Sequence, residues 1–346
     1  MNLSRATGRS SRKRRMVLAG MMAVVLAYPL VVPASVPESA AQESSARQQQ
    51  IAQALPEEGL VGAVWSTIDQ DGAVEVAAAG VADGRTGRVM TGDTRVHVGS
   101  VAKVVLGAGI LRLISEGRLS LDTPVASLLP SLAFDNPWEA SDPIRVRHLL
   151  AHTAGLENLR MWQFFSLQAD ADAPLSRVFT RDPSVLRVQA RPGARFRYSN
   201  LGYTLLGMVI EAVTGQRYEH SLDVHLLRPL AMTDSTFAYT AQTGPDADAR
   251  LAMGHFEDGR PQAAIALHLG PATQFTTTAR DMATFSRFLM GDGRVDGHGF
   301  IDPGLLQAMT SPDRTEAAEA GLRIGHGLLL AGRGPHGGSA GWHPGN

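Results

Sequence analysis

The stretch Gly99-Ser100-Val101-Ala102-Lys103 opens the most apolar helical segment of the sequence, which runs to Glu116. Apolar residues occur on every face of this segment, so we expect a buried helix that ends at Gly117. Ser100 and Lys103 are three residues apart and therefore lie on one face of the first helical turn. A lysine is unfavourable at this place, because a helix N-terminus is already positive and the surrounding residues are apolar.

The pairing of Ser100 with Lys103 suggests chemistry. A serine that opens a helix is usually only an N-cap. Burial and the helix dipole both lower the pKa of a lysine, so Lys103 could accept the proton of Ser100. Ser100 is thus a candidate nucleophile, and its backbone N–H could help to hold an oxyanion.

Two further motifs carry polar groups of the right kind. Tyr198-Ser199-Asn200 either packs Tyr198 on the core and caps a helix with Asn200, or brings a proton-shuttling phenol and a substrate-binding amide to Ser100. In His336-Gly337-Gly338 the glycines mark a simple bend or let a substrate approach a strand edge. In the second case the N–H of Ser339 would complete an oxyanion hole.

His148 and His152 form a third pattern, with the four-residue spacing of some zinc sites. The acid expected between the two histidines is missing, and the sequence offers no third ligand. We therefore expect no metal and no other cofactor.

The rest of the chain alternates between strand and helix patterns. A hairpin is expected from strands at 61–68 and 74–79, which flank the turn Asp71-Gly72. Further helices are expected at 43–55, 144–155, 201–214 and 279–290, and strands at 324–330 and from about residue 336. Strands at both ends with helices between them indicate an α+β protein whose sheet joins distant segments.

Composition narrows the function classes. The chain of 346 residues has a formal net charge of −1, which gives no reason to expect nucleic acid as a partner. It has no cysteine, which excludes a thiol nucleophile, an iron–sulfur cluster and Cys-ligated zinc.

The N-terminus resembles an export signal. A basic head with six Arg and Lys residues between Arg5 and Arg15 precedes an apolar run from Met16 to Val32, and small residues follow at Ser39-Ala40-Ala41. We therefore expect residues 1–41 to form a signal peptide, followed by one domain over 42–346. This predicts a periplasmic or extracellular protein, or a membrane-anchored one if the segment is not cleaved.

Taken in order, these motifs resemble the serine β-lactamases and penicillin-binding proteins. The Y-x-N form, the segment IRVRHLLAHTAGL (144–156) and the segment GARFRYSNLGYTLLG (193–207) are similar to the class C β-lactamase branch with its esterase and peptidase relatives. The resemblance implies an antiparallel sheet flanked by helices, with a helical subdomain. It also implies catalytic roles for Ser100, Lys103 and Tyr198, and a structural role for the 144–156 segment in which His152 orients a loop by hydrogen bonding. Substrate-binding roles fall to Asn200, His336, Gly338 and Ser339.

The chain departs from that pattern in two places. His336 stands where β-lactamases carry lysine, which puts activity on β-lactams in doubt. The chain also stops eight residues after Gly338, so C-terminal strands and a helix of the family fold are expected to be missing. Three hypotheses follow: a hydrolase of esters, amides or lactams; a penicillin-binding, peptidase-like protein that is acylated; and a non-catalytic module.

Overall fold

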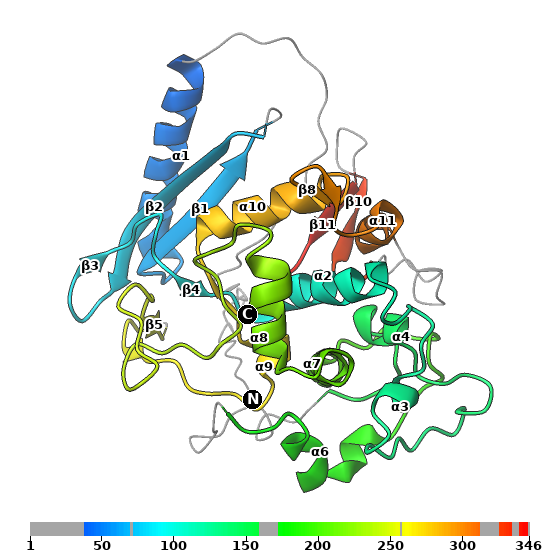
Figure 1. Ribbon diagram of the computed structural model, residues 1–346. Coiled ribbons are helices and arrows are strands. Elements are labelled where there is room, and N and C mark those ends of the chain that lie inside the picture. Colours follow the sequence, from blue (N-terminus) through cyan, green and yellow to red (C-terminus); the bar gives the residue numbers. More distant parts are fainter. Residues whose placement is uncertain are drawn as a thin grey trace, which may run out of the picture.

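The computed structural model describes residues 38–69, 72–158, 172–256, 258–311, 325–333 and 339–344 (Figure 1). Its α-helices are α1 (Glu38–Glu57), α2 (Ala102–Ser115), α3 (Val125–Leu128), α4 (Val146–Leu150), α6 (Arg177–Arg181), α7 (Asn200–Thr214), α8 (Tyr218–Leu222), α9 (Gly270–Thr273), α10 (Ala279–Leu289) and α11 (Pro303–Thr310). Short turns of other helix types are η1 (Gly99–Val101), η2 (Pro183–Leu186) and η3 (Asp223–Leu227). The strands are β1 (Gly62–Ile68), β2 (Val74–Asp83), β3 (Arg88–Val89), β4 (Val96–His97), β5 (Gly254–His255), β6 (Pro261–Gln262), β7 (Thr276–Thr277), β8 (Arg294–Val295), β9 (His298–Gly299), β10 (Leu329–Arg333) and β11 (Ser339–Trp342).

The largest sheet is the predicted hairpin with one short strand added. β1 pairs antiparallel with β2 from Gly62 opposite Gly80 to Ile68 opposite Val74, and β3 extends the order to β1-β2-β3. Helices α1 and α10 both contact β1 and β2, so distant parts of the chain cover this sheet (Figure 1). The other strand pairs of the described residues are also antiparallel. The predicted α+β class, with antiparallel sheets and helices, is confirmed.

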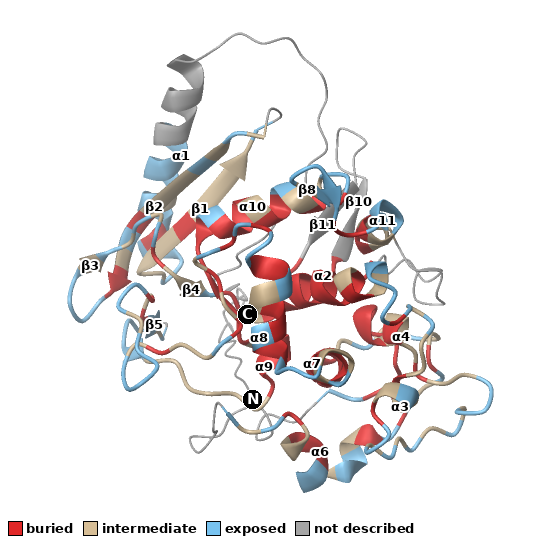
Figure 2. Cartoon of the chain, viewed as in Figure 1, coloured by how far each residue is buried: buried red, intermediate tan, exposed pale blue. Residues whose placement is uncertain are grey.

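The core is built around α2. Figure 2 shows this helix buried over most of its length, between α7, α9 and α11, which it contacts. Every residue of α2 from Ala102 to Leu111 is buried, as the sequence predicted, and Arg112 is the first that is partly exposed. Gly109 lets α2 approach the end of α8 closely, because a Cβ at this position would lie only 2.3 Å from Leu222 Cδ2.

One helix is shorter than predicted. The sequence suggested a helix over 144–155, but α4 ends at Leu150 and His152 has a φ of 57°. That φ takes the chain out of the helix, and the backbone of residues 152–153 bonds instead to residues 193–197 through Gly193 N–Thr153 O and Arg197 N–His152 O. The prediction that His148 and His152 share a helix was wrong, so the two side chains do not lie on one helical face as a zinc site with this spacing would require.

The structure describes the two ends of the chain only in part. Residues 1–37 of the expected signal peptide lie outside the described residues, and α1 begins at Glu38. Within the described ranges no helix is both long and apolar enough to span a membrane. The domain bounds and the missing C-terminal strands and helix remain predictions.

Candidate active site

Ser100 lies where a strand turns into the core helix. Strand β4 pairs with β7, and two residues later Gly99, with a φ of 51°, turns the chain into η1. Ser100 is inside this 3-10 turn and α2 begins only at Ala102, with no side-chain cap. The Ser100 side chain is therefore not a helix cap, and it is 5% exposed.

Lys103 is the direct partner of Ser100. Its Nζ lies 2.9 Å from Ser100 Oγ and 2.7 Å from the carbonyl oxygen of Ala272 in α9. Lys103 is 0% exposed, and in the described part of the chain no carboxylate forms an ion pair with it. Burial lowers the pKa of this amine well below its ordinary value. A neutral amine can donate one N–H to Ala272 and still accept the Ser100 proton through its lone pair.

Lysine is rare in this chain. The only other lysine in the 346 residues is Lys13, so arginine supplies the remaining cationic side chains other than histidine. A guanidinium stays protonated in proteins, whereas an amine can be deprotonated by burial. The single lysine of the described residues therefore lies within hydrogen-bond distance of Ser100, where a neutral amine could act as a base.

Tyr198 completes a three-residue group. Its phenol hydrogen-bonds with Ser100, and burial raises its pKa to about 12. Lys103 Nζ lies 4.9 Å from the centre of the Tyr198 ring. At neutral pH the phenol keeps its proton, so it can pass a proton between the serine oxygen and a leaving group.

His152 lies against Tyr198. The two ring centres are 4.5 Å apart, and His152 Nδ1 accepts the N–H of Ser199 at 3.1 Å. Burial is the main cause that lowers the pKa of His152 well below its usual range, with Lys103 and His343 adding to it. A neutral imidazole thus fixes the backbone directly after Tyr198, a role related to the loop-orienting one that the family resemblance implied.

Asn200 is the first residue of α7, not its cap. Ser199 caps the helix through its Oγ, which accepts the N–H of Gly202 at 3.1 Å. The backbone N–H and the side-chain Nδ2 of Asn200 both donate to Asn158 Oδ1, at 3.1 and 3.3 Å. Asn200 Oδ1 is buried with no hydrogen-bond partner among the described residues, which leaves an acceptor available.

The third predicted motif is only partly placed. His336, Gly337 and Gly338 lie outside the described residues. Ser339 begins β11, where its backbone is in register with Arg333 of β10. The substrate-binding roles of His336, Gly338 and Ser339 therefore stay predictions.

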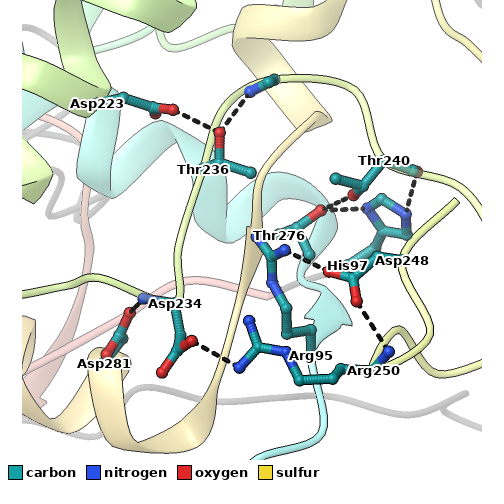
Figure 3. Close-up of polar contacts among 11 residues, drawn as sticks. Arg95, His97, Asp223, Asp234, Thr236, Thr240, Asp248, Arg250, Thr276 and Asp281 are labelled. Carbon is teal, nitrogen blue, oxygen red and sulfur yellow. Dashed lines mark hydrogen bonds and ion pairs between the residues drawn. The ribbon is translucent and has the colours of Figure 1, made fainter. Parts of the chain in front are cut away.

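A second polar cluster, which the sequence analysis missed, surrounds the strand that leads to Ser100 (Figure 3). Arg95 forms an ion pair with Asp248, and Arg250 forms one with Asp234 at 2.6 Å. Asp281 Oδ2 accepts the N–H of Asp234 at 2.9 Å. These contacts join β4 to the loop before β5 and to α10, and no local motif signals them because their partners are far apart in the sequence.

Comparison with known proteins gives a consistent result. The Beta-lactamase family model matches residues 48–345. Esterase EstB of Burkholderia gladioli is 32% identical over 219 residues, which are 61% of this chain and 54% of the esterase. Penicillin-binding protein 4 of Amycolatopsis lactamdurans is 30% identical over 232 residues, which are 64% of this chain and 58% of that protein. The chain thus spans little more than half the length of these two relatives.

Solved structures agree on the fold. The D-amino acid amidase of Ochrobactrum anthropi SV3, complexed with L-phenylalanine, superposes with a TM-score of 0.69 at 26% identity, over 88% of this chain and 84% of the amidase. The octameric penicillin-binding protein homologue from Pyrococcus abyssi has a TM-score of 0.69 at 23% identity, over 87% of this chain and 68% of the homologue.

Proposed function

The chain belongs to the beta-lactamase family, and from this we propose that it is a serine hydrolase that forms an acyl-enzyme on Ser100. The observation that carries the proposal is the 2.9 Å contact between Ser100 Oγ and the buried Lys103 Nζ, which forms no ion pair within the described ranges. A nucleophile within hydrogen-bond reach of an amine with a lowered pKa is the arrangement that serine acylation requires.

Acylation follows from these positions. The Ser100 oxygen attacks the substrate carbonyl carbon while its proton moves to Lys103 Nζ. The bond to the leaving group breaks, and Tyr198 donates a proton to that group and is reprotonated from Lys103. Water then cleaves the acyl–Ser100 bond, which releases a carboxylic acid and restores the hydroxyl.

The substrate class is an ester, an amide or a lactam. Esterase EstB and the D-amino acid amidase are similar to this chain and are named for two of these bonds. The histidine at position 336, where β-lactamases have lysine, argues against lactams as the main substrate. Asn200 Oδ1, a buried acceptor without a partner in the described residues, would take a hydrogen bond from the substrate.

A second candidate is a protein that is acylated but does not turn over. Its support is the 30% identity with a penicillin-binding protein. Incubation with a chromogenic ester, a chromogenic cephalosporin and a labelled penicillin separates the candidates, with mass spectrometry of the Ser100 peptide as the second readout.

Turnover of at least one substrate, lost in Ser100→Ala, is the expected result. Labelling of Ser100 without turnover would favour the second candidate. If no reagent modifies Ser100 in the folded protein, both proposals are wrong and a non-catalytic module is left.

Export by a signal peptide within residues 1–41 is part of the same proposal. It is supported by the basic head and the apolar run that follows it. N-terminal sequencing of the protein after expression in a bacterium with a periplasm should show a start near residue 42. A full-length protein in the cytosol would contradict export.

A further inference from the structure

A second histidine lies at the active site, in a segment that the sequence analysis did not single out. His343 follows β11 directly and is 1% exposed. Its ring centre lies 6.1 Å from that of Tyr198, the residue whose phenol bonds to Ser100. The C-terminal strand pair therefore delivers an imidazole to the catalytic tyrosine.

The hydrogen bonding of His343 defines its protonation. Nδ1 lies 2.7 Å from the carbonyl oxygen of Pro344, and a carbonyl can only accept, so Nδ1 carries the hydrogen. Burial is the main cause that lowers the pKa of His343 to about 4, and Lys103 also lowers it. At neutral pH the ring is neutral, and its lone pair is on Nε2. Among the described residues no hydrogen bond to Nε2 is found.

Lys103 is poorly placed to serve both halves of the reaction. Its Nζ lies 2.9 Å from Ser100 Oγ and 2.7 Å from Ala272 O, a position that suits removal of the serine proton. Once Ser100 is acylated, the attacking atom is a water oxygen, which needs a base beside the carbonyl carbon rather than beside Oγ. His343 is a second neutral base that borders the same group of residues.

We propose that His343 is the general base that activates water for hydrolysis of the acyl–Ser100 ester. The water oxygen bonds to the acyl carbon as one of its protons moves to His343 Nε2. The bond from that carbon to Ser100 Oγ then breaks, and Oγ takes a proton from Tyr198, which recovers one from the imidazolium of His343. The acid releases its remaining proton to solvent and leaves as a carboxylate, so one water is consumed, every side chain returns to its starting state, and no oxidant or reductant is required. This inference rests on the proposed acyl-enzyme.

Rapid mixing with excess 4-nitrophenyl ester tests the step, because the burst reports acylation and the steady rate reports deacylation. His343→Phe keeps a ring of similar size and removes the lone pair. We expect a burst close to wild type and a steady rate lower by about 10²-fold or more, with the acyl group on Ser100 seen by mass spectrometry. Hydroxylamine, which attacks esters without a general base, should restore turnover of this variant.

Two variants serve as matched controls. His298→Phe alters an exposed histidine of β9 and should leave both phases unchanged. His152→Phe removes the imidazole that holds the backbone after Tyr198, so we expect it to slow the burst itself. If His343→Phe does not unfold cooperatively on heating, His343→Gln is used in its place, and the acyl-enzyme on Ser100 is expected to accumulate in the same way.

The outcomes separate this inference from the proposed function. If the wild type forms no Ser100 adduct, the proposed function fails and the inference with it. If the wild type turns over and His343→Phe matches it, His343 is not the base, although the function stands. Equal losses in the burst and the steady rate would also overturn the inference, because they indicate a purely structural role.

Discussion

Two basic residues, Arg95 and Lys103, lie eight positions apart on either side of β4 in surroundings that differ in charge. Arg95 is paired with Asp248, within a cluster where Arg250 pairs with Asp234 (Figure 3). Lys103 is more deeply buried and, among the described residues, has only a hydroxyl and a carbonyl as hydrogen-bond partners. The charge that stabilises the fold is compensated, whereas the amine that we propose as a base has no counter-ion in the described part of the chain, which favours loss of its proton.

The largest effect is expected when the uncompensated member is removed. Lys103→Met should lower ester or amide turnover by about 10³-fold or more, because nucleophile and base act as a unit. Its melting temperature should not fall, since an apolar side chain of similar length replaces a buried amine. Steady-state kinetics and a thermal melt check both. A variant with near wild-type turnover would show that Lys103 is not the base.

Arg95→Met should give the opposite pattern. It leaves Asp248, whose side chain is 17% exposed, without its partner. We expect a loss of about 2–3 kcal/mol in the free energy of unfolding, because removing one member of a largely buried pair leaves an uncompensated charge. Turnover per folded molecule should stay within a few-fold of wild type. Urea unfolding and kinetics at a stabilising temperature measure the two. A large loss of turnover without destabilisation would erase the contrast with Lys103.

The dependence of stability on pH sharpens the contrast further. The pKa of Lys103 is lowered in the folded protein, so between that pKa and about 10.5 the unfolded chain binds a proton that the folded one does not. Wild-type stability should therefore rise with pH from 7 to 9 relative to Lys103→Met, with a slope of at most about 1.4 kcal/mol per pH unit. Urea unfolding at several pH values measures this difference. Identical slopes in the two proteins would mean that Lys103 is protonated when folded.

The smallest effect is expected at the surface. Arg187 and Asp135 form an ion pair at 2.8 Å with side chains that are 65% and 61% exposed. Solvent screens such pairs, so Arg187→Ala should change the free energy of unfolding by less than about 1 kcal/mol and leave turnover unchanged. Chemical denaturation checks it. A loss of unfolding free energy as large as that of Arg95→Met would show that burial does not determine how much these two ion pairs stabilise the protein.

Much of this arrangement could be predicted from local pattern. The three-residue spacing of Ser100 and Lys103, the apolar α2 and the hairpin of β1 and β2 depend on neighbours in the sequence, and each was found. The helix after Tyr198 also ends at Gly215 as expected, with a φ of 70°.

What the sequence did not reveal depends on long-range contacts. Ala272 O binds Lys103 through its backbone, which no side-chain motif marks. His152 leaves α4 because its backbone bonds to a segment some 45 residues later, and a local pattern cannot report such a contact. No sequence motif singled out His343, which lies near Tyr198 because β11 leads the chain back to this site.

The protonation of Lys103 is the most direct test of the whole account. The sequence contains only two lysines, so a protein labelled with ε-¹³C lysine gives one Lys103 signal, and Lys13 adds a second in the uncleaved chain. We expect the Lys103 signal to titrate well below 10.5, the ordinary value of a lysine. The same titration in Ser100→Ala shows whether the shift depends on burial, and there we expect it to persist. A Lys103 signal that titrates at about 10.5 or above would contradict the claim that this lysine is the neutral base of Ser100.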